Sequence, residues 1–134
     1  MNPHAIEVTK ASYARCLASP GFLSDFYQRF FANCPAAEPL FAQTDFERQI
    51  RLLQHAIGLL IAFGHQPADD PSLLTRLARK HGPDELAIEP LWYPIFLRSL
   101  IEAAAKHDPE FTPAVAGAWH EALTPGIEFM AKFH

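Results

Sequence analysis

The sequence is poor in cysteine and in long apolar runs, and each scarcity excludes a class of protein. The two cysteines among its 134 residues, Cys16 and Cys34, fit no spacing of metal ligands, so we expect them to be small buried side chains. The longest apolar stretch, residues 57–63, is interrupted by Gly58 and is far too short to cross a bilayer. The first ten residues lack a basic stretch followed by an apolar one, so we expect no signal peptide and a cytoplasmic protein.

An excess of positive charge is also missing. Lysine and arginine together number 11, against 15 aspartates and glutamates, which gives a formal net charge of −4. This balance argues against nucleic acid or an anionic membrane surface as the main partner. Hydrophobic residues make up 49% of the chain and charged residues 19%, which excludes a disordered protein. We therefore expect one domain over residues 1–134, with one buried core.

Proline, in contrast, is abundant, and its positions divide the chain into helices. Proline is tolerated at the first position of a helix, because the N–H that it lacks would have no partner there. Thr44 and Glu47 have the spacing of a capping box, whereas residues 34–43 predict an irregular connection. Several of the 12 prolines follow residues that cap helices well: Asn2-Pro3, Ser19-Pro20, Asp70-Pro71 and Asp108-Pro109. Together these signals predict about six helical segments.

Apolar residues recur at helical spacing within these segments. Phe22, Phe26 and Phe30 lie four residues apart and therefore share one helix face. Strict alternation of apolar and polar residues, which is typical of strands, is absent. Residues 88–97 are apolar enough for a strand, but Pro94 lies in the middle and the helical spacing continues beyond it. The sequence therefore predicts an all-α domain.

Among the seven histidines, His81 has the most suggestive position. It ends the predicted helix over 71–81, on the same apolar face as Leu77 and Ala78, and residues 82–83 (Gly-Pro) end that helix. Carbonyls at the helix end can accept its Nδ1–H, which leaves the Nε2 lone pair directed into the core. No two histidines have the HxxxH or HExxH spacing, so a zinc site on one helix is not supported. From the residues alone, His81 is either a satisfied core histidine or a ligand.

Four blocks of sequence, which follow one another in order along most of the chain, together indicate a family. The blocks are residues 26–31 with Pro39-Leu40-Phe41, Gln49-x-x-x-Leu53, Leu77-Ala78-x-x-His81 and Ile88-x-Pro90-x-x-Tyr93. Each block is too short to be specific by itself, but their order and approximate spacing resemble those of bacterial globins. The similarity is to single-domain haemoglobins and to the globin domains of flavohaemoglobins and sensor proteins. The resemblance implies a globin fold, with helices packed around a haem pocket.

The resemblance also implies a role for the residues of each block. His81 would bind the iron of haem b through Nε2, and Phe41 would stack on the porphyrin. Tyr27 and Gln49 would lie on the distal side, where a hydroxyl and a carboxamide can donate hydrogen bonds to O2, and Leu53 would close that side. Further contacts with the cofactor would come from Leu77, Lys80, Ile88 and Tyr93.

Several alternatives remain open at this point. Gln49 would be an exposed helix residue if Leu52 or Leu53 took its place, and iron ligation by Gln49 or His55 is not excluded. The resemblance implies reversible binding of O2, NO or CO, with O2 carriage or storage as the first interpretation. One alternative is an NO dioxygenase, which would need an external reductase. A second is a gas sensor that acts through a partner protein. Under each of these interpretations the protein could be a monomer or a homodimer.

Overall fold

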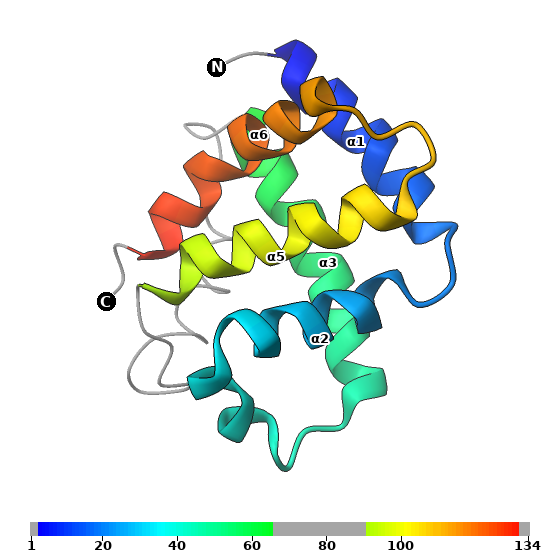
Figure 1. Cartoon of the computed structure of the whole chain (residues 1–134). Coiled ribbons are helices and arrows are strands. Elements are labelled where there is room, and N and C mark those ends of the chain that lie inside the picture. Colours follow the sequence, from blue (N-terminus) through cyan, green and yellow to red (C-terminus); the bar gives the residue numbers. More distant parts are fainter. Residues whose placement is uncertain (1–2, 66–90, 132–134) are drawn as a thin grey trace.

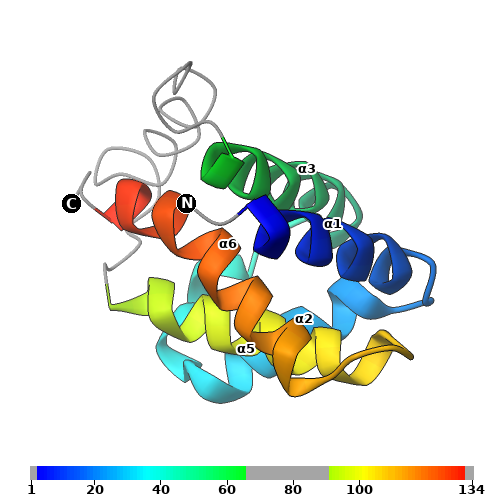
Figure 2. The same cartoon turned by 90° about the horizontal axis from the view of Figure 1, so that it is seen from above.

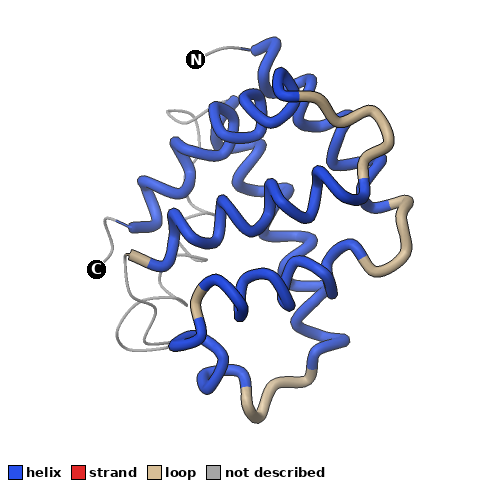
Figure 3. Tube along the Cα trace, in the orientation of Figure 1, coloured by secondary structure: helices blue, strands red, loops and turns tan. Residues whose placement is uncertain are grey.

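The computed structural model describes residues 3–65 and 91–131, and every regular element in these two ranges is a helix (Figures 1 and 3). The prediction of an all-α domain is therefore confirmed. None of the helices in these ranges is long and apolar enough to span a membrane. The predicted helix over 71–81 lies outside the described residues. The elements are α1 (Pro3–Leu17), α2 (Phe22–Asn33), the 3-10 helix η1 (Pro35–Phe41), α3 (Phe46–His65), α5 (Trp92–His107) and α6 (Pro113–Ala131).

Helix α2 begins later than the proline pattern predicts. Its first residue is Phe22 rather than Pro20, and the residue before it, Gly21, has a φ of 80°. Glycine adopts this left-handed conformation without the steric cost that other residues meet. Ser19, the expected cap, instead bonds through its hydroxyl to Nδ1 of His107 at 2.7 Å. The Ser19 side chain, which the sequence predicts as the cap of α2, therefore forms a tertiary contact with α5 instead.

The start of α6 is shifted for the same kind of reason. The sequence predicted a start at Asp108 and the proline after it, but α6 begins at Pro113. There the Thr112 hydroxyl accepts the backbone N–H of Val115 at 3.2 Å, as an N-cap does. The Asp108 carboxylate accepts a hydrogen bond of 2.6 Å from Nε of Arg15, and this bond joins α1 to the end of α5.

The connection between α2 and α3 is more regular than predicted. Most of the stretch expected to be irregular forms η1 (Pro35–Phe41). Asp45, rather than Thr44, caps α3, because one of its carboxylate oxygens accepts the backbone N–H groups of Glu47 and Arg48 at 3.1 and 3.4 Å. The helix predicted for this region is therefore present, and its cap lies one residue later.

Aromatic contacts join the helices in pairs. Figure 2 shows α3 on one side of the molecule and α5 with α2 on the other, with α6 running between them. Phe26 of α2 meets Phe96 of α5 edge-on, with ring centroids 5.1 Å apart. Tyr13 of α1 meets Trp119 of α6 in the same manner at 6.0 Å. These contacts bury large rings between the helices, which is the main source of stability for an all-helical domain of this size.

Helices α3 and α6 approach each other closely at Gly126. A Cβ atom on Gly126 would lie 2.8 Å from Cδ2 of Leu60 and 3.4 Å from the Leu60 carbonyl oxygen. A side chain at this position would therefore have to displace the end of the Leu60 side chain, and glycine avoids that contact. The crossing places Leu60 and Ile127, one residue after the glycine, at the wall of an internal cavity.

Candidate ligand-binding cavity

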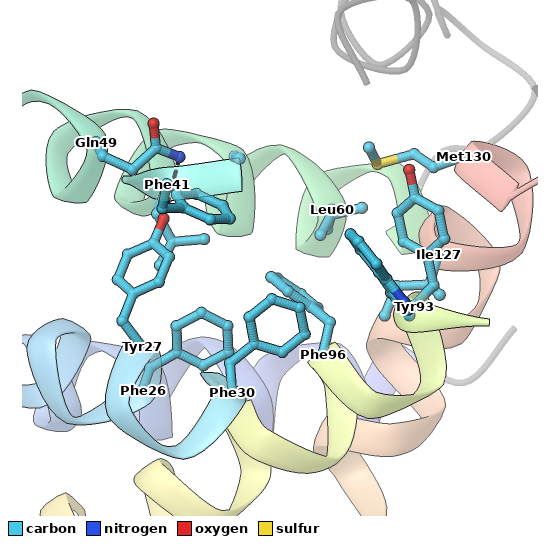
Figure 4. A pocket seen from close by; sticks show the side chains of 13 residues that line it. Phe26, Tyr27, Phe30, Phe41, Gln49, Leu60, Tyr93, Phe96, Ile127 and Met130 are labelled. Carbon is cyan, nitrogen blue, oxygen red and sulfur yellow. Dashed lines mark hydrogen bonds between the residues drawn. The ribbon is translucent and has the colours of Figure 1, made fainter. Parts of the chain in front are cut away.

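A partly open cavity of about 100 Å³ lies between five of the elements (Figure 4). The wall is mostly aliphatic and aromatic, and α2, η1, α3, α5 and α6 all contribute to it. The lining residues are Phe26, Tyr27, Phe30, Phe41, Gln49, Leu53, Ala56, Leu60, Trp92, Tyr93, Phe96, Ile127 and Met130.

Three phenylalanines form a rigid apolar part of this wall. Phe26 and Phe30 are one helical turn apart on α2, and their rings stack at 5.8 Å with an angle of 8° between them. Phe96 of α5 completes the group at 6.3 Å from Phe30. The resemblance gave these side chains no site role, although the four-residue spacing of Phe26 and Phe30 is visible in the sequence.

Tyr27 and Gln49 form a polar pair at one end of the cavity. Nε2 of Gln49 donates a hydrogen bond to the Tyr27 hydroxyl oxygen at 3.1 Å. Tyr27 is only 6% exposed, and this burial raises the pKa of its hydroxyl to about 12, although the Gln49 bond acts in the opposite direction. Within the described residues, Tyr27 accepts this bond and donates none. The remaining described residues thus leave its O–H hydrogen unused.

Phe41 and Leu53 lie next to this pair. Phe41, the last residue of η1, has its ring centroid 5.8 Å from that of Tyr27. Leu53 is buried and follows Gln49 by one turn of α3, so both face the cavity. Leu52 is 47% exposed and does not line the cavity. The helix register is therefore the one in which Gln49 and Leu53 point inward together.

Tyr93 lies toward the opposite end of the cavity, close to Ile127 and Met130 (Figure 4). It is buried in the first turn of α5, and burial raises the pKa of its hydroxyl to about 12. Both tyrosines of the cavity are thus protonated at neutral pH. Ile127 and Met130 come from the last turns of α6, which no block of the sequence pattern had assigned to the site.

Other predicted site residues do not line the cavity or lie outside the described residues. His55 is exposed on α3 and faces a groove toward α1, where Tyr13 and Leu17 are its neighbours. The predicted iron ligand and three predicted cofactor contacts all fall in the stretch 66–90, which the structure does not describe. These residues are His81, Leu77, Lys80 and Ile88.

Comparison with known proteins agrees with this architecture. The family model described as Globin matches residues 24–128, which is most of the chain. The chain is also similar to PA3967, a Pseudomonas aeruginosa PAO1 protein whose crystal structure is described as highly homologous in structure to a human haemoglobin. The two are 32% identical with a TM-score of 0.90, over 96% of this chain and 97% of the other. No curated protein matches. The chain belongs to the globin family.

Proposed function

We propose that this globin holds a haem b in the cavity between α2, α3, α5 and α6 and binds a diatomic gas there reversibly. Globins generally bind haem, and a bound haem supplies an iron atom that can take O2, NO or CO. The cavity suits such a group, because its wall is predominantly apolar and aromatic, as a planar macrocycle requires. Its polar side chains are few, and two of them are paired at one end.

Different residues of the chain would contact different parts of the cofactor. Phe41 provides an aromatic face at the cavity wall, and Leu53 and Tyr93 add buried contacts from α3 and α5. In this proposal His81 would bind the iron, and Leu77, Lys80 and Ile88 would add further contacts with the cofactor. The sequence predicts that His81 ends a helix before Gly-Pro, which would keep Nε2 free to bind iron.

The hydrogen-bonded pair of Tyr27 and Gln49 is the observation that supports O2 as the favoured ligand. A gas that gathers negative charge when it binds is stabilised by a donor held in a dry pocket, and each charge-assisted bond contributes about 1.5–3 kcal/mol. Gln49 orients the Tyr27 oxygen from α3, and the phenol hydrogen then serves as that donor. CO stays nearly neutral and gains little from it. The pair therefore favours tight O2 binding and slow release, which suits carriage or storage.

The proposal is tested first at the iron ligand. His81→Ala is expected to abolish stable haem incorporation, or to leave a ferrous spectrum without the signature of an axial histidine. His55→Ala is the matched control, because His55 is exposed and does not line the cavity. Absorption spectra of both purified variants, with and without added imidazole, decide the question. An unchanged spectrum in His81→Ala, or a lost one in His55→Ala, would overturn the assignment.

A further inference from the structure

A second pocket opens on the surface beside η1 and shares one residue with the internal cavity. Its lining is largely apolar, with Glu38 as the charged member, and consists of Phe31, Pro35, Glu38, Pro39, Phe41, Ala42 and Phe46. Phe41 lines this surface pocket and also lines the internal cavity. Phe41 therefore lies between this surface pocket and the cavity.

The rings around Phe41 show where an opening at this point would lead. Phe41 lies 5.3 Å from Phe31 and 6.2 Å from Phe46, measured between ring centroids. The Tyr27 ring contacts all three phenylalanines, at 5.4 to 5.9 Å. A displaced Phe41 ring would thus join the surface pocket to the end of the cavity where Tyr27 meets Gln49.

The backbone that holds Phe41 is weakly constrained compared with the long helices. Phe41 ends a 3-10 helix with Pro39 inside it, and hydrogen bonds of this helix type have poorer geometry than those of an α-helix. Next to it, the Ala42 N–H reaches the Pro39 carbonyl at 3.3 Å. Phe41 itself is half-buried, and Phe46 beside it is 37% exposed. Elements with few buried contacts open at low free-energy cost, so ring motion is easier here than within α2.

We propose that Phe41 gates the entry of diatomic gas, which reaches the Tyr27 end of the cavity through the surface pocket at η1. The inference rests on the proposed function, and it adds the path by which the ligand arrives. O2, CO and NO are small and nearly apolar, so a predominantly apolar pocket of this kind can hold them. A gate changes the rates of entry and exit by the same factor and leaves the equilibrium affinity unchanged.

A groove between α5 and α6 is the competing route, since Ile127 lines both that groove and the cavity. Ile127 is held within a long α-helix, is only 7% exposed and lies at the end of the cavity near Tyr93. Entry there would require a buried helical side chain to move. It would also bring the gas in far from the Tyr27 hydroxyl, so the path past Phe41 is the one that the structure favours.

Two exposed alanines allow a matched test, because each lines only one of these surface features. Ala42→Trp should fill the pocket at η1, and Ala105→Trp should fill the groove between α5 and α6. In the haem-loaded protein, Ala42→Trp is expected to slow association and dissociation of both O2 and CO by about ten-fold, which is a barrier change of about 1.4 kcal/mol. Ala105→Trp should change neither rate. Laser photolysis and stopped-flow mixing measure both steps.

Two further measurements keep the result decisive. Phe46→Ala should widen the surface pocket and speed both steps, which provides a test even if Ala42→Trp does not fold. Crystals under xenon pressure should show the gas beside Phe41 in the wild type and not in Ala42→Trp. Unchanged rates in Ala42→Trp and Phe46→Ala, or slowing by Ala105→Trp alone, would overturn the gate. If these variants have a normal haem spectrum but the rates contradict the gate, the proposed function still holds. If the wild-type protein does not bind haem, the proposed function itself is wrong.

Discussion

Two polar clusters lie inside this largely apolar molecule, and they differ in how completely they are bonded. The Asp108 carboxylate is fully buried and accepts hydrogen bonds from Ser12 Oγ at 2.6 Å, from Arg15 Nε and Nη2 at 2.6 and 3.0 Å, and from the Glu110 N–H at 2.9 Å. Trp119 Nε1 donates to the same Ser12 oxygen at 2.8 Å. The pair of Tyr27 and Gln49 shares a single bond of 3.1 Å and faces a cavity.

The difference separates a structural cluster from the pair to which we assign ligand binding. The bonds to Asp108 come from α1 and from the turn before α6, so they fix how these helices meet, and they use the acceptor capacity of both carboxylate oxygens. Among the described residues, the Tyr27 hydroxyl accepts one bond from Gln49 and donates none. The Asp108 cluster, with more bonds, holds helices together, whereas the Tyr27 pair, with one bond, faces the cavity.

The largest effect on stability should follow from removing Asp108. Asp108→Ala would leave the Glu110 N–H and the Ser12 hydroxyl without this acceptor and would remove the buried partner of Arg15, which would keep only Glu110 at 3.7 Å. We therefore expect the free energy of unfolding to fall by about 2–4 kcal/mol. Tyr27→Phe should cost less than about 1 kcal/mol, because it breaks one bond at a cavity wall. Urea unfolding of both variants measures the contrast. If both variants lost the same free energy of unfolding, the two clusters would not differ in their contribution to stability.

A smaller effect should appear in acid. Burial alone would raise the pKa of Asp108, but the bonds from Arg15, Ser12 and the Glu110 N–H lower it from its ordinary 3.8 to about 2. Because the folded pKa is depressed, the ionised carboxylate stabilises the fold above about pH 4, and this contribution of about 2 kcal/mol is lost as the pH falls toward 2. Unfolding free energies across this range should show the loss in the wild type and not in Asp108→Asn. If the unfolding free energy of both proteins fell equally between pH 4 and pH 2, Asp108 would not be the cause of the loss.

The smallest effect concerns the partner of Tyr27. Gln49→Leu removes the bond that orients the phenol, so O2 dissociation should become about five-fold faster, which corresponds to about 1 kcal/mol. In the double variant with Tyr27→Phe, Gln49→Leu should increase the O2 dissociation rate by a smaller factor than it does alone, because both side chains belong to one hydrogen-bond network. Stopped-flow dissociation rates of the single and double variants test this. Full additivity would mean that the two residues act independently.

The helices could be predicted from the sequence, whereas several of their starts could not. Apolar spacing and proline placement suffice to identify α2, α3, α5 and α6. The expected caps failed where a distant partner took the side chain: Ser19 bonds to His107, and Asp108 bonds to Arg15. Thr112-Pro113 has the same capping pattern as Asp108-Pro109, so the sequence alone does not tell at which of the two pairs α6 begins. The tertiary contacts of Asp108 determine that it begins at Pro113.

The cavity was anticipated in part. The resemblance assigned Tyr27, Gln49, Phe41, Leu53 and Tyr93 to one site, and all five line the same cavity, although their roles toward haem remain predictions. Helical periodicity explains this success, because it fixes which side chains of α2 and α3 face inward together. The contributions of α6 depend on how that helix crosses α3 at its glycine. That crossing is a property of packing and leaves no local pattern in the sequence.

The dissociation rates of O2 and CO from Tyr27→Phe test the central claim most directly. Phenylalanine keeps the ring and removes only the hydroxyl that Gln49 orients. If that hydroxyl donates to the bound gas, losing about 1.5–3 kcal/mol should speed O2 dissociation by about 10- to 100-fold and change CO dissociation far less. Equal changes for the two gases would mean that Tyr27 acts only by its bulk, and the hydrogen-bonding account would be wrong.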